Sequence, residues 1–226
     1  MKKLNKNFII GGSLFLMFAL FTVLVKFVGV EPIGPLGSSV GLAGLNELFM
    51  INQTSNIWDL FGDVIMIIAA ASALVFVSLG VIQLAKRKSI KKVDKNIFVL
   101  AGLYVLIAVV FVLFEIVVIN NRPILENGEL AASYPSSHVL ISMTLLLSAL
   151  IQAHKYYLKG SKKLLVLCDI VAAVLVVALV TSRMLAGVHW ITDIIASVLI
   201  SASLIYIYRG VLETTENKNT KDKTLD

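Results

Sequence analysis

Residues 182–193 read SRMLAGVHWITD and join two apolar runs, at about residues 163–182 and 187–208, each long enough to cross a membrane as a helix. Three ionisable side chains, those of Arg183, His189 and Asp193, therefore lie where two hydrophobic segments turn. Because such groups are costly in a bilayer, they indicate a functional site. His189 and Asp193 are four residues apart, so the carboxylate can orient the imidazole from the same helix face. Arginine matches phosphate oxygens, and the stretch therefore predicts chemistry on an anion.

The rest of the chain is equally apolar. Of its 226 residues, 58% are hydrophobic, and the mean hydropathy is +0.90, which excludes a soluble domain. We expect an all-α polytopic membrane protein, with one domain over residues 1–212 and a polar, disordered tail over 213–226. Only helices satisfy the backbone inside lipid. Six runs qualify, the first as an uncleaved transmembrane helix rather than a signal peptide: 7–28, 60–85, 96–119, 136–154, 163–182 and 187–208.

The charges are distributed unevenly over the connections. Lysines gather before the first run, between the second and third, between the fourth and fifth, and after the sixth. The positive-inside rule then places both termini in the cytoplasm, in a protein expected in the plasma membrane of the cell envelope. The net charge of +6 is explained by these loops and does not indicate nucleic-acid binding. The single cysteine, Cys168, excludes an intrachain disulfide.

Three polar clusters fall on the extracytoplasmic side of this topology. They are residues 120–123, residues 134–138 and residues 182–193. In the second cluster Pro135 suits a helix start, where unpaired backbone N–H groups form an anion site. His138 follows in the first turn, placed to donate a proton. Independent structural residues would be scattered over both faces, so the convergence predicts one active site.

These clusters resemble the three signature motifs of the type 2 phosphatidic acid phosphatase family, whose core is shared with vanadium haloperoxidases. The family pattern is Lys-x6-Arg-Pro, Pro-Ser-Gly-His and Ser-Arg-x5-His-x3-Asp. The third motif is complete here, and the second reads Pro-Ser-Ser-His at residues 135–138. The first keeps Arg122 and Pro123 but has Glu115 where the lysine is expected. The resemblance implies a six-helix membrane phosphatase with a haloperoxidase-like core.

The resemblance also implies roles for individual residues. His189 is similar to the nucleophile that becomes phosphohistidine, Asp193 to the residue that orients it, and His138 to the general acid. The phosphate would be bound by Arg122, Arg183, Ser136 and Ser137. No metal and no cofactor is implied. A metal site of His138, His189 and Asp193 is the alternative, disfavoured because two neighbouring arginines would repel a cation.

The expected activity is hydrolysis of a lipid phosphate or diphosphate at the outer leaflet, through a phosphohistidine. Candidate substrates are polyprenyl diphosphate, phosphatidylglycerophosphate, phosphatidate and diacylglycerol diphosphate. The expected partners are the bilayer and its lipid phosphates. Two alternatives stay open: a phosphotransferase that uses an acceptor other than water, and a catalytically weakened protein that binds or transports lipid phosphate. Glu115 keeps the second alternative open, because a carboxylate beside a phosphate is unfavourable.

Three interpretations of Glu115 follow from its apolar helix. The carboxyl group is protonated, or it pairs with Lys26 near the outer end of the first run, or it meets a positive group on the substrate. We favour the pairing with Lys26, which is otherwise an unpaired charge in an apolar run.

Several other polar or aromatic residues have simpler interpretations. Asp59 and Asp63, at the start of the second run, are interpreted first as helix-capping residues. Tyr134 and Trp190 are interpreted as interface aromatics, and His154 as an interfacial histidine. Residues 42–50 are expected to form a short helix in the membrane interface.

Overall fold

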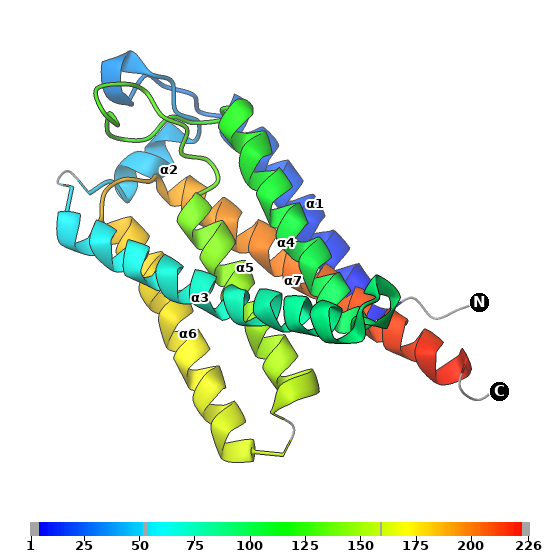
Figure 1. Cartoon of the computed structure of the whole chain (residues 1–226). Helices are drawn as coiled ribbons and strands as arrows, with labels where there is room; N and C mark the ends of the chain where they lie inside the picture. The colour runs from blue at the N-terminus through cyan, green and yellow to red at the C-terminus, as the bar shows by residue number, and fades with distance from the viewer. Residues whose placement is uncertain (1–4, 52–53, 159, 223–226) are drawn as a thin grey trace.

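The structure, a computed structural model, describes residues 5–51, 54–158 and 160–222. Helices joined by loops make up this part of the chain (Figure 1). The α-helices are α1 (Lys6–Phe27), α2 (Ala43–Leu48), α3 (Asn56–Arg87), α4 (Lys95–Ile116), α5 (Ser137–Gln152), α6 (Lys162–Leu185) and α7 (Ile191–Asp222). Short 3-10 turns lie at η1 (Pro35–Gly37) and η2 (Ile90–Lys92), and a π-helical turn, η3 (Ala153–Tyr157), extends α5.

Six helical segments in the described part are long and apolar enough to cross a membrane. They are α1, α3, α4, α5 with η3, α6 and α7, which confirms the six predicted spans and the all-α class. Apart from the end of α7, which lies at Asp222 rather than at residue 208, the boundaries differ by a few residues. In particular, α3 begins at Asn56 rather than at residue 60, so Asp59 lies in its first turn.

The most extensive contact between two helices in the described part joins α1 to α7. Helix α7 also packs against α5 and α4. Gly11 of α1 lies so close to α7 that a Cβ there would be 2.8 Å from the Ile207 side chain. Ser203 of α7 donates a hydrogen bond to the Gly11 carbonyl at 2.8 Å. Small residues permit such close approach between membrane helices. The result is a fixed position for α7, whose first turn carries Asp193.

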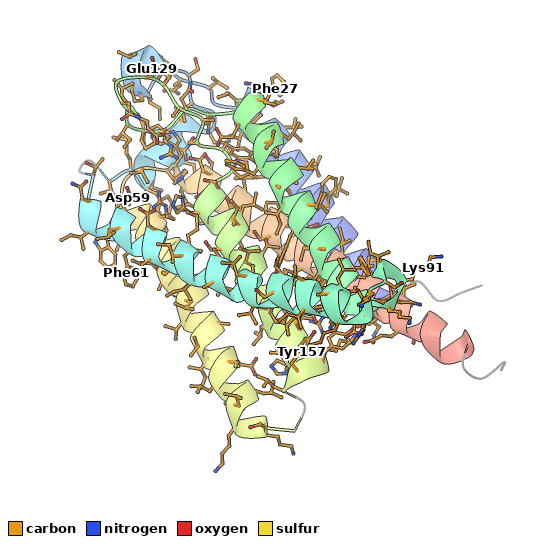
Figure 2. The ribbon with its side chains drawn as sticks, in the orientation of Figure 1. Phe27, Asp59, Phe61, Lys91, Glu129 and Tyr157 are labelled. Carbon is orange, nitrogen blue, oxygen red and sulfur yellow. The ribbon has the colours of Figure 1, made fainter. Side chains whose placement is uncertain are left out.

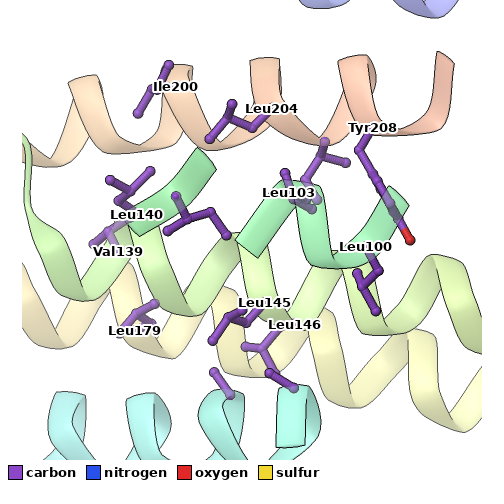
Figure 3. Packing of buried hydrophobic residues seen from close by; sticks show 14 of the residues in the cluster. Leu100, Leu103, Val139, Leu140, Leu145, Leu146, Leu179, Ile200, Leu204 and Tyr208 are labelled. Atoms are coloured by element: carbon purple, nitrogen blue, oxygen red, sulfur yellow. The ribbon is translucent and has the colours of Figure 1, made fainter. Parts of the chain in front are cut away.

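Figure 3 shows part of the apolar centre of the bundle, to which α1, α3, α4, α5, α6 and α7 all contribute. Leu140 of α5 packs with Ile200 and Leu204 of α7, together with Leu103 of α4 and Leu179 of α6. All five side chains are almost completely buried. Because this cluster lies directly below the starts of α5 and α7, it supports the end of the bundle where the polar clusters meet.

The polar segment after residue 212 differs from its prediction as a disordered tail. Helix α7 continues to Asp222, and its side chains have partners. Glu213 accepts a hydrogen bond from Asn5 at 2.9 Å, and Glu216 forms an ion pair with Lys155 at 2.8 Å. These long-range contacts extend the helix beyond the apolar run. Residues 223–226 lie outside the described part.

Candidate active site

The three polar clusters meet at one end of the bundle, beneath the loops that join α1 to α3 and α4 to α5 (Figure 1). In Figure 2, Asp59 and Glu129 mark this end, and Lys91 and Tyr157 mark the opposite one. The backbone N–H of Ser136 donates to the Asp193 carbonyl, with the two atoms 3.3 Å apart, and so joins the start of α5 to the start of α7. A narrow cleft here is lined by Arg122, Ser137 and His189, among others.

His189 lies in the turn between α6 and α7, with Asp193 behind it. Its Nδ1 is 3.5 Å from Oδ2 of Asp193, and that oxygen accepts a hydrogen bond from the Trp190 backbone N–H at 2.9 Å. The Asp193 side chain is completely buried. Both ring nitrogens of His189 are buried, and neither has a hydrogen-bond partner among the described residues. With Nδ1 facing the carboxylate, Nε2 is the nitrogen left for a ligand.

Burial holds the pKa of His189 well below its usual value, and the positive charges of Arg183 and Arg122 lower it further. The imidazole is therefore neutral near neutral pH. A neutral imidazole keeps a lone pair, which is what a nucleophilic histidine needs.

Arg183 is held in place from α3. Its Nη1 donates to Oδ1 of Asp59 at 2.7 Å, and the residue is only 1% exposed. Gly62, one turn along α3, lies against the Arg183 side chain and against Ser182. The Arg183 Nε is buried without a hydrogen-bond partner in the described part. The guanidinium is thus anchored at one edge and has a free donor at another.

Arg122 comes from the loop between α4 and α5, which folds back on itself. The Arg122 N–H donates to the Ala131 carbonyl at 2.9 Å, and its Nε lies 3.5 Å from Oε2 of Glu126. The Arg122 side chain is mostly buried. This loop therefore adds a second guanidinium to the cleft that contains His189.

The start of α5 supplies the remaining predicted residues. Ser136 is the N-cap residue, but its side chain makes no capping bond, and its buried Oγ has no partner within the described residues. Ser137 begins the helix and lines the cleft. Nε2 of His138 lies 2.8 Å from Oδ1 of Asp63, and its buried Nδ1 has no partner in the described part. Unpaired donors and hydroxyls at a helix start are suited to an anion.

Asp59 and Asp63 are residues whose role the sequence interpretation missed. They were expected to cap α3, whereas their carboxylates contact Arg183 and His138. Their only signal in the sequence is the i, i+4 spacing, which places both carboxylates on one face of α3.

Two asparagines tie neighbouring segments together here: Asn120, from the first predicted cluster, and Asn46, which the sequence interpretation did not single out. Asn120 accepts a hydrogen bond from the Gly41 N–H at 3.1 Å. Asn46 of α2 donates to the Gly41 carbonyl at 2.9 Å and accepts from the Thr192 N–H at 3.2 Å. The short helix predicted at residues 42–50 therefore exists as α2, but it is tied to the start of α7.

Glu115 lies in the last turn of α4 and lines the same cleft as Arg122 and His189. The favoured pairing with Lys26 is wrong. The Lys26 ammonium donates instead to the Val118 carbonyl at 3.0 Å, and the ion pairs of the described residues include none with Glu115. The carboxylate is therefore available to whatever occupies the cleft.

The aromatic residues near the site are more deeply buried than interface aromatics. Tyr134 stacks on Phe18, and its hydroxyl hydrogen-bonds Thr22 at 2.7 Å. Burial raises the pKa of Tyr134 above its usual value, so the phenol stays protonated. Trp190 is 2% exposed and donates from Nε1 to the Asn121 carbonyl at 2.7 Å. Both interpretations as interface aromatics are therefore wrong.

His154 lies far from this site, at the other end of α5. It is partly exposed, and its Nε2 lies 2.7 Å from Oδ1 of Asp169 in α6. The alternative metal set of His138, His189 and Asp193 is not assembled as one, since the described residues contain no group of three His, Cys, Asp or Glu side chains that could hold a metal ion.

Comparisons with known proteins bear on this arrangement. Residues 117–216 match the model of the PAP2 superfamily, and this range contains all three clusters. The chain also superposes on the crystal structure of "the first transmembrane PAP2 type phosphatidylglycerolphosphate phosphatase from Bacillus subtilis" with a TM-score of 0.57 and 19% sequence identity. The match covers 90% of this chain and 96% of that chain, and it shows a shared fold. No curated protein matches the chain in sequence.

Proposed function

We propose that this chain, whose residues 117–216 match the model of the PAP2 superfamily, is a membrane lipid phosphatase that works through a phosphohistidine. The observation that carries the proposal is the environment of His189. A neutral, buried imidazole has its Nδ1 facing Asp193 and its Nε2 without a partner in the described part, close to two arginines. Such an arrangement presents a nucleophile to an anion.

Phosphate binding would fall to the donors around His189, of which Arg122 and Ser137 line the cleft and Arg183 acts on the His189 ring by its charge. Arg122 and Arg183 supply fixed positive charge, and Ser136 and Ser137 add hydroxyls at the start of α5. Phosphoryl transfer depends mainly on positioning and on stabilising the charge of the transferring group. Two guanidinium groups provide that stabilisation without a metal ion.

The reaction would take place in two balanced steps. In the first, the His189 Nε2 lone pair forms a bond to phosphorus while the bond from phosphorus to the leaving oxygen breaks. That oxygen keeps the bonding electrons and takes a proton from His138. In the second step, His138 accepts a proton from water as the water oxygen bonds to phosphorus, and the P–N bond breaks to restore His189. Asp193 stabilises the charge on His189 during both steps.

The substrate class follows from where the site lies. The described part has six candidate membrane spans, and the site lies at one end of the bundle that they form, where a phosphate on a lipid headgroup would reach it from the membrane surface. We therefore propose lipid phosphates or diphosphates as substrates, such as phosphatidylglycerophosphate, phosphatidate or polyprenyl diphosphate. The lysine-rich connections, by the positive-inside rule, favour cytoplasmic termini and an extracytoplasmic site in the plasma membrane. The substrate would then lie in the outer leaflet.

The experiment is phosphate release from a panel of these lipids by purified protein in detergent, with EDTA present. We expect turnover in EDTA, inhibition by vanadate, and no turnover by His189→Ala. Because that change leaves the buried Asp193 carboxylate without its histidine, His189→Gln provides a second, better-filled variant. Replacing His154, which lies at the far end of α5, is the matched control and should leave activity unchanged.

Labelled enzyme identifies the intermediate. After brief reaction with radiolabelled lipid phosphate, the protein should carry acid-labile label that is absent from the His189 variants. Substantial phosphate release by His189→Gln would refute the phosphohistidine mechanism. Transfer of the label to an alcohol in preference to water would instead identify a phosphotransferase.

A further inference from the structure

Helix α3 contributes two carboxylates to the site, four residues apart on one face. Oδ1 of Asp59 accepts a hydrogen bond from Arg183 at 2.7 Å, and Oδ1 of Asp63 lies 2.8 Å from Nε2 of His138. One contact holds a phosphate-binding group, and the other holds the proposed acid. Helix α3 therefore contacts both the arginine proposed to bind phosphate and the histidine proposed to donate the proton.

The contact with Asp63 determines which nitrogen of His138 can exchange a proton with the substrate. An ionised carboxylate is only an acceptor, so Nε2 must carry the hydrogen between them. Neutral His138 then has its lone pair on Nδ1, and protonated His138 has a second N–H there. Nδ1 is buried and has no hydrogen-bond partner in the described part of the chain. It is therefore the atom that can deliver a proton to a leaving oxygen.

The charges around His138 indicate that Asp63 also stabilises the protonated form of this histidine. Arg183 lies in the same site, so positive charge from α6 acts on the ring. An imidazolium formed beside Arg183 needs a close anion, and the nearest one is Asp63. Asp59 also faces this region, but its direct contact is with Arg183.

We propose that Asp63 is the positioning residue for leaving-group protonation and that it fixes His138 with Nδ1 toward the substrate. Asp59 serves phosphate binding through its contact with Arg183. The proposal rests on the phosphatase function argued above. It gives two similar carboxylates on one helix different roles, one in leaving-group protonation and one in phosphate binding. The division makes the two residues controls for each other.

The test uses two synthetic substrates that differ only in the leaving group. Both are phenyl phosphates with the same long alkyl chain, and one has a nitro group on the ring. The nitrophenolate leaves readily without a proton, whereas the plain phenolate needs one. The value of kcat/KM reports steps up to departure of the leaving group, so later attack by water does not obscure the comparison.

Asp63→Asn should lower kcat/KM for the plain phenyl phosphate by about tenfold to a hundredfold, within the usual contribution of general acid catalysis. For the nitrophenyl phosphate the loss should be no more than about threefold. Asp59→Asn should lower kcat/KM for both substrates by the same factor, because phosphate binding is common to both. Asp63→Glu keeps a carboxylate and should recover part of the activity on the plain compound. It also covers the case in which Asp63→Asn fails to fold.

Two outcomes would overturn the inference. In one, Asp63→Asn lowers kcat/KM for both substrates equally, as a merely structural role predicts. In the other, Asp63→Glu is no better than Asp63→Asn on the plain compound. Failure of the proposed function itself looks different, since the unaltered protein would then release no phosphate from either compound or from lipid phosphates.

Discussion

A single methyl group added at Gly62 should reduce catalysis without weakening the fold. Gly62 lies in α3, where this helix touches α6 beside the site. An alanine Cβ there would be 2.9 Å from Nη1 and 3.0 Å from Cδ of Arg183, and 3.3 Å from Oγ of Ser182. The shortest of these distances is about 0.5 Å below the 3.4 Å at which ordinary contact begins. Arg183 is 1% exposed, so it has little room to move without disturbing its contact with Asp59.

The expected loss of kcat/KM follows from the displacement of Arg183. Catalytic groups must be held to within about 0.5 Å, and an error of about 1 Å costs up to about a hundredfold in rate. We therefore expect Gly62→Ala to lower kcat/KM by about tenfold, equivalent to ~1.4 kcal/mol of transition-state stabilisation. Stability should change little, because the preference for alanine over glycine in a helix interior, about 1 kcal/mol, offsets the strain of crowding Arg183.

The assay is phosphate release from a lipid phosphate, with the melting temperature measured on the same preparation in detergent. Gly102→Ala is the matched control. It adds the same methyl group to α4, where nothing lies within 4 Å of the new Cβ, so activity should be unchanged. Full activity of Gly62→Ala would refute the view that the position of Arg183 limits catalysis. An equal loss in both variants would show that the effect does not come from the site.

Three further predictions concern charge and topology. The pKa of His189 is lowered in the folded protein, so the unfolded chain binds more protons below about pH 6.5. The free energy of unfolding should therefore fall as the pH drops below that value. The melting temperature of His189→Gln should fall less steeply over the same range. In a Cys168→Ser background, a cysteine at position 128 should react with an impermeant thiol reagent on intact cells and one at position 89 should not; the reverse labelling would refute the proposed orientation. Glu115→Lys should raise kcat/KM for simple lipid phosphates by about fivefold, the effect of about 1 kcal/mol at an exposed ion pair, and an unchanged value would show that Glu115 does not act on the substrate.

The sequence predicts the spans well because the membrane leaves few choices. An apolar run in lipid must be a helix, so the six runs became the six helices, with α4 ending at Ile116 rather than at residue 119. It predicted less well where tertiary contacts decide. Helix α7 extends through a polar segment because Glu213 and Glu216 find partners on other elements, and no local pattern encodes those partners.

In the site, too, the residues marked by local sequence were predictable, and those defined by tertiary contacts were not. Arg183, His189 and Asp193 were recognisable because ionisable residues stand out in an apolar chain. Asp59 and Asp63 were not, because their partners lie 124 and 75 residues away along the chain. The sequence alone does not distinguish an aspartate that caps the start of its own helix from one whose carboxylate contacts another helix. Lys26 was assigned to Glu115 by charge alone, yet in the folded chain a backbone carbonyl is its acceptor.

Both arginines of the site already have a carboxylate beside them, Asp59 for Arg183 and Glu126 for Arg122. A bilayer surface presents a dense array of phosphodiester headgroups, and bare guanidinium groups next to it would attract all of them. With these built-in counter-ions the resting site attracts anions only weakly at long range. Selection then depends on short-range fit to a terminal phosphate, which carries more charge and more free oxygens than a diester. Under the proposed function, this arrangement would slow capture of the substrate and would keep the surrounding lipids from blocking the site.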